Sequence, residues 1–390
     1  TDRRRVSAAG SPGSTNRELD ERPRRQPGSF RSTVESMSEV SSYDPLAPDT
    51  VADPFPAYAW LREQCPVHRT DQFGHPLYTV SRRADVHRIL TDPWHWSNMR
   101  GPGVGYAGVE RRGDLQRFDP PEHTSRRKFA RAEFNPVQVQ LLIEHTTPRA
   151  DRQRIKAWAD AMVQGLSDPY AAGPATEELR QYVLEMVQSV RAGKEIPDGL
   201  MKTYSMREFN GALMDEREMA NMFSQLLVGG HETTTSLITN MVYRLLDRRE
   251  LWERLLVDRS LCEAAVEESL RFDPPVLGLC RTNNDETELG EYHLEPGTKL
   301  MVLYASANRD PAAFTDPDTF SLDRPWSELR RHYSFGWGMH HCLGAPIARQ
   351  TARVALETLL DRFPTLRLTG ESERIAPEFL WGKRKLFVTW

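Results

Sequence analysis

Three adjacent residues near the carboxyl end of the sequence have side chains that could bind a metal ion or act as nucleophiles. His340, His341 and Cys342 lie within FGWGMHHCLG, residues 335–344. Three consecutive residues cannot all reach one tetrahedral ion from a regular element, so a zinc site would need ligands from elsewhere in the chain. A Cys–His nucleophile needs contact between its two side chains, which sequence neighbours rarely achieve.

The glycines around this cluster indicate a loop whose backbone approaches a flat and bulky partner. Gly336 and Gly338 precede Cys342, and Gly344 follows it. The next residues, APIARQTARVALETLLDRF, have helical periodicity. Cys342 is therefore expected just before a helix amino terminus, where free N–H groups stabilise a thiolate. A thiolate in that position suits an axial ligand of haem iron.

The clearest helix is predicted over residues 216–247. It starts with a capping-box pattern formed by Asp215 and Glu218, and apolar residues then recur on one face. The stretch GGHETTT at 229–235 interrupts this pattern, because each interior glycine costs about 1 kcal/mol. Residues with poor helix propensity inside a predicted helix are typical of functional sites. A close crossing by another helix would also explain the glycines. A zinc-protease HExxH motif is excluded, because the residue four after His231 is Thr235.

A second helix is predicted within SLCEAAVEESLRFDPP, residues 260–275. Ser260 and Glu263 form another capping-box pattern, and the two prolines end the helix. Glu268 and Arg271 are three residues apart and share a face. Such a pair contributes only about 0.2–0.5 kcal/mol when exposed, so its spacing alone carries little information.

Taken together, FGWGMHHCLG, EESLR and LLVGGHETTT resemble the signature elements of the cytochrome P450 family, in the family's order and spacing. The resemblance extends from about Asp53 to the last residue. It implies a mainly α fold with a small β part, in which haem lies between a long distal helix and a proximal loop and helix carrying the cysteine. The segments PLYTVSRRADVHRIL and HLEPGTKLMVLYASAN are expected to form short strands that lead into helices or turns.

The resemblance assigns the haem contacts by family position. Cys342 is expected to be the axial ligand, with Phe335 beside its sulfur and Gly344 in the same loop. The haem propionates are expected to meet four basic residues, namely His123, Arg127, Arg281 and His340. His341 receives no role and is expected at the surface.

On the distal side, the resemblance places dioxygen in a groove opened by Gly229 and Gly230. Glu232 and Thr233 match the family's acid–alcohol pair, in which a carboxylate relays protons and a hydroxyl positions the dioxygen. The substrate pocket is expected to include Val228, Leu277 and Gly278, with residues 101–108 as a mobile loop above it.

The sequence departs from the family pattern in two places. Near residues 141–150 only about a dozen residues stand where relatives have further helices, so a segment is deleted or missing there. Glu268 and Arg271 match the family's buried structural pair, but Thr319 replaces an arginine that completes this network in many relatives. Arg324 is a candidate to take its place.

Several basic residues lie near the helices that flank the proximal loop. They are Arg126, Lys128, Arg131, Arg349 and Arg353. In the family this face receives a small acidic electron carrier, so a ferredoxin-type donor is expected to dock there. A solvated helix face is the alternative interpretation, and a net charge of −4 gives no reason to expect nucleic acid.

Composition sets the remaining expectations. Residues 1–42 are rich in Arg, Ser, Pro and Gly and are predicted to form a disordered tail, and residues 43–390 a single catalytic domain. No apolar run is long enough to span a membrane, and no secretion signal is visible. The four scattered cysteines favour reduced thiols. A monomer in the cytoplasm is expected.

These observations predict a haem b monooxygenase of the bacterial type. It is expected to insert one oxygen atom of O2 into a largely hydrophobic natural-product substrate, with electrons from NAD(P)H through a separate reductase and ferredoxin. Oxidative coupling or desaturation by the same haem–thiolate site is an alternative reaction. A non-catalytic haem sensor is an alternative of another class, although a sensor would not need Glu232 and Thr233.

Overall fold

The computed structural model describes residues 42–105, 114–132, 134, 151–164, 173–194, 199–370, 372–375 and 379–390. All of them belong to the unit Val40–Trp390. The predicted amino-terminal tail, apart from its last residue, and the short segment near 141–150 lie outside the described residues.

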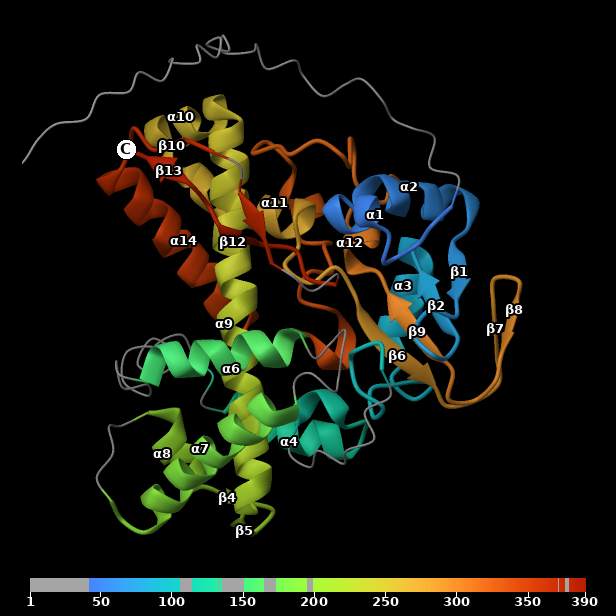
Figure 1. Cartoon of the computed structure of the whole chain (residues 1–390), viewed down its shortest axis with the longest axis vertical. Coiled ribbons are helices and arrows are strands. Elements are labelled where there is room, and N and C mark those ends of the chain that lie inside the picture. The colour runs from blue at the N-terminus through green and yellow to red at the C-terminus, as the bar shows by residue number, and fades with distance from the viewer. Residues whose placement is uncertain are drawn as a thin grey trace, which may run out of the picture. The chain divides into compact units, whose positions relative to one another are not determined.

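Helices form most of the described chain (Figure 1). The longer ones are α2 (Phe55–Gln64), α3 (Arg83–Thr91), α4 (Glu122–Arg131), α6 (Arg152–Gln164), α7 (Gly173–Arg191), α9 (Glu216–Asp247), α10 (Arg249–Val257), α11 (Cys262–Phe272) and α14 (Ala345–Arg362). The shorter ones are α1 (Pro48–Ala52), α8 (Leu200–Ser205), α12 (Tyr304–Ala307), α13 (Trp326–Leu329) and the 3₁₀ turns η1 (Leu115–Arg117), η3 (Arg259–Leu261) and η4 (Gly338–His340).

Within the described residues, the β part is one five-stranded sheet with four strand pairs. In the sheet, the order is β1 (Val67–Thr70), β2 (Leu77–Val80), β9 (Lys299–Val302), β6 (Leu279–Asn283) and β3 (Trp96–Ser97), and only β2 and β9 are parallel. The pairs are β4 (Glu208–Phe209) with β5 (Ala212–Leu213), β7 (Thr287–Leu289) with β8 (Tyr292–Leu294), β10 (Arg367–Leu368) with β13 (Val388–Thr389), and β11 (Glu373–Arg374) with β12 (Lys383–Lys385). The strand-to-helix predictions for both segments are confirmed by β2–α3 and β9–α12.

Helix α9 has the predicted bounds and the predicted cap. The Asp215 carboxylate accepts hydrogen bonds from the N–H groups of Arg217 and Glu218. The helix continues unbroken through its two glycines. No described atom lies within 4 Å of where a Cβ would stand on Gly229 or Gly230, so a close helix crossing does not explain them.

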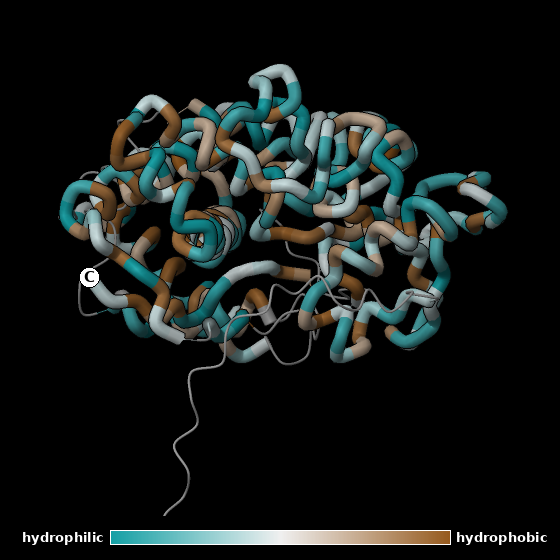
Figure 2. Tube along the Cα trace, turned by 90° about the horizontal axis from the view of Figure 1, so that it is seen from above, coloured by the Kyte–Doolittle hydropathy of each residue, from teal (hydrophilic) through white to brown (hydrophobic). Residues whose placement is uncertain are grey.

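Two apolar clusters pack around α9. Its carboxyl half packs with α10, α11 and α14 through Met241, Leu245, Trp252 and Leu356. Its amino half packs with α6, α7 and α8, which lie beside its lower part in Figure 1. Figure 2, viewed from above, shows many apolar segments in the interior around this helix. The middle of α9, where the glycines lie, therefore stands between two well-packed regions.

The predicted cap of the second helix is wrong. Asp258 accepts hydrogen bonds from both the N–H and the hydroxyl of Ser260, at 2.9 and 2.6 Å. Because Asp258 takes this role, the chain first makes the η3 turn, and α11 begins at Cys262 without a side-chain cap. Among the described residues, no helix is both long and apolar enough to cross a membrane.

Candidate active site

The loop before α14 holds Cys342 in a fixed turn. Gly336 and Gly338 have φ angles of 66° and 68°, which favour glycine. The Cys342 N–H donates to the Phe335 carbonyl oxygen at 2.8 Å. A Cβ on Gly338 would lie 2.4 Å from the carbonyl oxygen of Leu90 in α3. Gly338 is thus required for close packing against α3.

The Cys342 sulfur stands beside the start of α14. The side chain is exposed, but enough protein surrounds the sulfur that burial raises the pKa of the thiol. The amide of Gly344, the Arg127 guanidinium and the amide of Ala345 lower this pKa in turn. The amides at the start of α14 therefore lower the pKa of the thiol as predicted, but burial raises it by more.

A buried charge network lies behind the same loop. The Glu267 carboxylate accepts hydrogen bonds from Arg349 at 2.6 Å and pairs with His332 at 3.0 Å. The Arg349 guanidinium also lies over the Phe335 ring, 4.5 Å from its centre. Burial alone would raise the pKa of Glu267, but the bonds from His332 and Arg349 lower it to about 2. Sequence reasoning missed Glu267 and His332, because no spacing pattern links them.

Two imidazoles from separate elements meet beside the loop. His123 of α4 and His340 of η4 have ring centres 4.1 Å apart. His123 Nδ1 and His340 Nε2 are buried, and within the described chain they have no hydrogen-bond partner. Burial and then the positive charge of Arg281 lower the pKa of His340 to about 2, while burial and Arg127 lower that of His123 to about 4.

Two arginines complete this basic cluster. Arg127 donates to the carbonyl oxygen of His341 at 2.5 Å, and Arg281 donates to that of Cys280 at 2.9 Å. Considering described residues only, no carboxylate forms an ion pair with either arginine or with His123 or His340. Buried hydrogen-bond donors that have no anion beside them favour the binding of an anionic group. The cluster therefore fits the two carboxylates of a haem.

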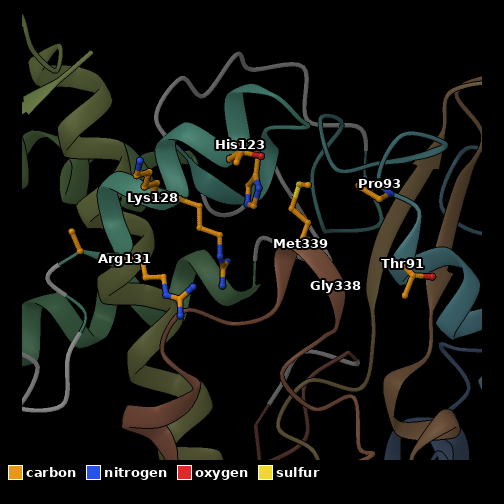
Figure 3. A pocket seen from close by; sticks show the side chains of 10 residues that line it. Thr91, Pro93, His123, Lys128, Arg131, Gly338 and Met339 are labelled. Atoms are coloured by element: carbon orange, nitrogen blue, oxygen red, sulfur yellow. The ribbon is translucent and has the colours of Figure 1, made fainter. Parts of the chain in front are cut away.

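Next to this cluster lies a cavity of about 910 Å³ between α4 and the loop. In Figure 3, His123, Lys128 and Arg131 of α4 lie on one side and Met339 on the other. Lys128 and Arg131 are exposed, and within the described chain neither has a carboxylate partner. His341 is half-buried, with its ring centre 6.3 Å from that of Phe335, so only part of its side chain lies at the surface.

The other three basic residues expected in the docking face are engaged elsewhere. Arg126 is buried, pairs with Glu122 and Glu218 at 2.9 and 3.2 Å, and lies over the Phe118 ring. Arg349 is held by Glu267, as described above. Arg353 pairs with Glu357 at 2.8 Å along α14. The burial of Arg126 contradicts its predicted place in the docking face. Arg349 and Arg353 are partly exposed, so their place in that face stays a prediction.

A second cavity, of about 210 Å³, lies along α9. Thr233, Gly229 and Val228 line it, but Gly230 and Glu232 do not. The Thr233 hydroxyl donates to the Gly229 carbonyl oxygen at 2.6 Å. The predicted Leu277 and Gly278 are also absent from its lining: Leu277 lies in an apolar cluster, and a Cβ on Gly278 would lie 2.6 Å from the Val302 carbonyl oxygen.

Val276 and Leu279 line the cavity in place of those two residues. Glu232 faces another way, toward α6. Its carboxyl contacts Asp160 and Ser236. Burial, and then the charge of Asp160, raise the pKa of Glu232, while Lys156 acts in the opposite direction. Asp160 is a neighbour that sequence reasoning missed, because it lies 72 positions from Glu232 with no motif joining them.

The structural pair forms a buried network. Arg271 donates two hydrogen bonds to Glu268, at 2.8 and 2.7 Å, and both side chains are fully buried. Arg324 donates to the same carboxylate at 3.0 Å, and Thr319 contributes only its carbonyl oxygen. Arg324 thus takes the place in the Glu268–Arg271 network that an arginine at position 319 would have in many relatives.

Comparisons with known proteins point to one family. The family model for cytochrome P450 matches residues 171–390. A 20-oxo-5-O-mycaminosyltylactone 23-monooxygenase of Streptomyces fradiae is 31% identical over 92% of this chain and 94% of its own length. Nocardicin C N-oxygenase of Nocardia uniformis subsp. tsuyamanensis is 32% identical over 91% of this chain and 100% of its own.

Solved structures give the same result. The cytochrome P450 CREJ in complex with (4-ethylphenyl) dihydrogen phosphate superposes with a TM-score of 0.78 at 26% identity, over 87% of this chain and 98% of that one. The chain therefore belongs to the cytochrome P450 family and is a P450 monooxygenase with a haem-iron cofactor. The predicted mainly α fold with a small β part is confirmed.

Proposed function

We propose that this chain is a haem b monooxygenase of natural-product metabolism that takes its electrons from NAD(P)H through a reductase and a ferredoxin. The observation that carries the proposal is the unpaired basic cluster beside the Cys342 loop. The names of the two relatives, which act on a mycaminosyltylactone and on nocardicin C, support the substrate class. We further propose a monomer in the cytoplasm, where the four free cysteines would stay reduced.

The chain's own residues would hold the cofactor. Cys342 would bind the haem iron through its sulfur, toward which the Gly344 amide is directed. His123, Arg127, Arg281 and His340 would bind the propionates. When bound, the haem supplies the activation of dioxygen.

Two residues of α9 would handle protons on the distal side. The Glu232 carboxyl contacts Asp160 on the α6 side, and its raised pKa favours the protonated form. It could donate a proton once its side chain turns from Asp160 toward the cavity. Thr233 places a hydroxyl at the cavity wall, where it can turn from the Gly229 carbonyl oxygen toward a bound molecule. The oxidation of substrate would therefore depend on both side chains.

Thr233→Ala tests this role, with Thr235→Ala as the matched control. Both hydroxyls donate to a carbonyl oxygen four residues back, but only Thr233 lines the cavity. We expect Thr233→Ala to retain haem while most of the NAD(P)H consumed yields hydrogen peroxide, and Thr235→Ala to stay coupled. Unchanged coupling in Thr233→Ala would refute the assignment.

A further inference from the structure

Three side chains that can bind a metal ion meet outside the cavity along α9. One ligand atom from each of Asp160, His231 and Glu232 lies within 4.8 Å of those of the other two. Asp160 belongs to α6, and His231 and Glu232 belong to α9, where the two helices pack against each other (Figure 1). None of the three residues lines the cavity. The His–Glu pair that lacks the rest of an HExxH motif thus has a carboxylate from α6 beside it.

The chemistry of these three groups suits a transition-metal dication. Zinc sites combine imidazole nitrogens with carboxylate oxygens, and a water molecule often takes the fourth position. Around a tetrahedral zinc ion, neighbouring ligand atoms stand roughly 3.3 Å apart. Rotations of the side chains would therefore close the present cluster around an ion. Two ionised carboxylates in contact repel each other, and a dication between them removes that repulsion.

The imidazole of His231 is available to such an ion. The side chain is half-buried, and within the described chain it forms no hydrogen bond. Burial, and then the charge of Lys156, lower the pKa of His231. The ring is therefore neutral at about pH 7, which is the form that binds metal ions.

A buried hydroxyl group lies next to the same cluster. Ser236 is 1% exposed and stands one turn after Glu232 along α9. Its hydroxyl is close enough to the Glu232 carboxyl to lower the pKa of that group, yet within the described chain it makes no hydrogen bond of normal geometry. Buried hydroxyls are usually hydrogen-bonded, and a water molecule on a bound metal ion would supply the missing partner.

Lys156 is the cation that stands at the cluster in this structure. Its ammonium group pairs with Asp160 at 2.8 Å, one turn away along α6. The two side chains are 55% and 44% exposed, and exposed pairs of this kind contribute little to stability. A dication can therefore displace the lysine. The one lysine also faces two carboxyl groups, so negative charge is in excess when both are ionised.

We propose that Asp160, His231 and Glu232 bind a transition-metal dication such as Zn²⁺, which ties α6 to α9. The ion would hold the Glu232 carboxyl on the α6 side, away from the cavity. Because Glu232 is the proposed proton donor, occupation of the site slows the oxidation of substrate. This second part rests on the proposed function, whereas metal binding itself does not.

Isothermal titration of the haem-loaded full chain with zinc chloride measures the binding. Loss of one of three ligands should weaken the affinity for Zn²⁺ at least about tenfold. We expect this loss in both His231→Ala and Asp160→Asn. An unmodified chain that binds no Zn²⁺ would refute the site.

His293→Ala is the matched control. His293 also stands between two carboxylates, at 2.8 Å from Glu288 and 3.8 Å from Glu295, but they approach different nitrogens of its ring. The three groups therefore cannot converge on one ion, and the variant should keep the full affinity. If His231→Ala and His293→Ala lower the affinity equally, the proposed site is wrong.

Lys156→Gln gives a prediction of opposite sign. Removal of the competing positive charge should tighten the binding of Zn²⁺ by about threefold or more. A variant that had merely damaged the packing of α6 would bind the ion more weakly. Unchanged or weaker affinity in Lys156→Gln would contradict the position of the ion beside Asp160.

Turnover tests the effect on Glu232, and each chain is compared with itself. With reductase and ferredoxin present, Zn²⁺ should slow the oxidation of NAD(P)H by the unmodified chain and affect Asp160→Asn much less. Any action of the metal on the reductase or ferredoxin is common to both chains. Equal slowing in both chains, or none in either, would overturn the proposed effect on proton donation.

The reduced, carbon-monoxide-bound spectrum separates the metal site from the proposed function. This spectrum reports thiolate ligation and does not depend on the cluster between α6 and α9. A haem–thiolate spectrum in a chain that binds no Zn²⁺ would refute only the metal site. Absence of that spectrum from an unmodified chain that binds Zn²⁺ would refute the proposed function and leave the metal site standing.

Discussion

Glu267 shows how a single carboxylate can hold the proximal loop from behind. It binds Arg349, whose guanidinium lies over Phe335, and it binds His332 on the segment leading into the loop. Because all these groups are wholly or partly buried, the ion pair is protected from solvent screening. We infer that it fixes the loop that carries Cys342.

The pH dependence of stability tests this network. The pKa of Glu267 falls from 4.5 to about 2 in the folded chain, so its contribution is full above about pH 4.5 and is lost as the pH falls toward 2. Relative to Glu267→Gln, the unmodified chain should lose about 2 kcal/mol of unfolding free energy between pH 6 and pH 3. Urea titrations at both pH values measure this difference.

Glu263→Gln is the control, because Glu263 is an exposed residue of the same helix. Its difference from the unmodified chain should stay constant with pH. A pH-independent difference for Glu267→Gln as well would show that the carboxylate gains nothing from its two partners.

At this scale, the sequence predicted residues whose roles follow from local spacing. His123, Arg127 and His340 come together as the resemblance implies. Leu277 and Gly278 were each misplaced by one position: Leu277 packs in an apolar cluster and Gly278 lies against Val302, while their neighbours Val276 and Leu279 line the cavity. Glu218, one of the two partners of Arg126, and Glu267, the partner of Arg349, come from distant segments, so no local pattern could have shown these two contacts. The pairing of Arg126 with Glu122 is local, four residues apart on α4.

Helix α9 is the element that joins the packed regions to the cavity. Its bounds could be predicted because the cap at Asp215 and the apolar periodicity agree. The glycine pair was correctly identified as unusual, but the helix does not break there. The hydroxyls of Thr233 and Thr235 bond back to carbonyl oxygens of the same helix instead.

Substitutions of Gly229 and Gly230 should have different effects on ligand binding but the same effect on stability. Gly→Ala within a helix adds about 0.5–1 kcal/mol of stability, and there is space for a Cβ at both positions. We expect both Gly229→Ala and Gly230→Ala to raise the free energy of unfolding in urea. Only Gly229→Ala should weaken binding in the cavity, because only Gly229 lines it.

Spin-state titrations that follow the Soret band with an apolar probe such as dodecanol measure that binding. Gly230→Ala serves as the matched control for any general effect on α9. Equal losses of affinity in the two variants would contradict the placement of Gly229 at the cavity wall.

At the scale of the whole molecule, the described part of the chain has positive charge without a carboxylate partner at one face of α4. Lys128 and Arg131 stand beside the cavity in Figure 3, whereas Arg353 is paired along α14. Electrostatic steering of an acidic electron carrier would depend on the unpaired charges. This surface, defined by Lys128 and Arg131, is smaller than the five-residue face predicted from the sequence.

Charge reversal tests this surface. Lys128→Glu and Arg131→Glu should each slow reduction by a ferredoxin about tenfold at low salt, and the effect should fade as salt screens the charges. Arg353→Glu should change the rate much less. Stopped-flow reduction across a range of ionic strength measures this, and equal effects of all three variants would contradict the assignment.

The central claim is that Cys342 ligates haem iron through its thiolate. The most direct measurement is the absorption spectrum of the reduced, carbon-monoxide-bound protein. We predict the strongly red-shifted Soret band of thiolate ligation in the unmodified chain and in Cys65→Ser, and its loss in Cys342→His. A histidine-type band in the unmodified chain, or a red-shifted band that survives in Cys342→His, would contradict the account.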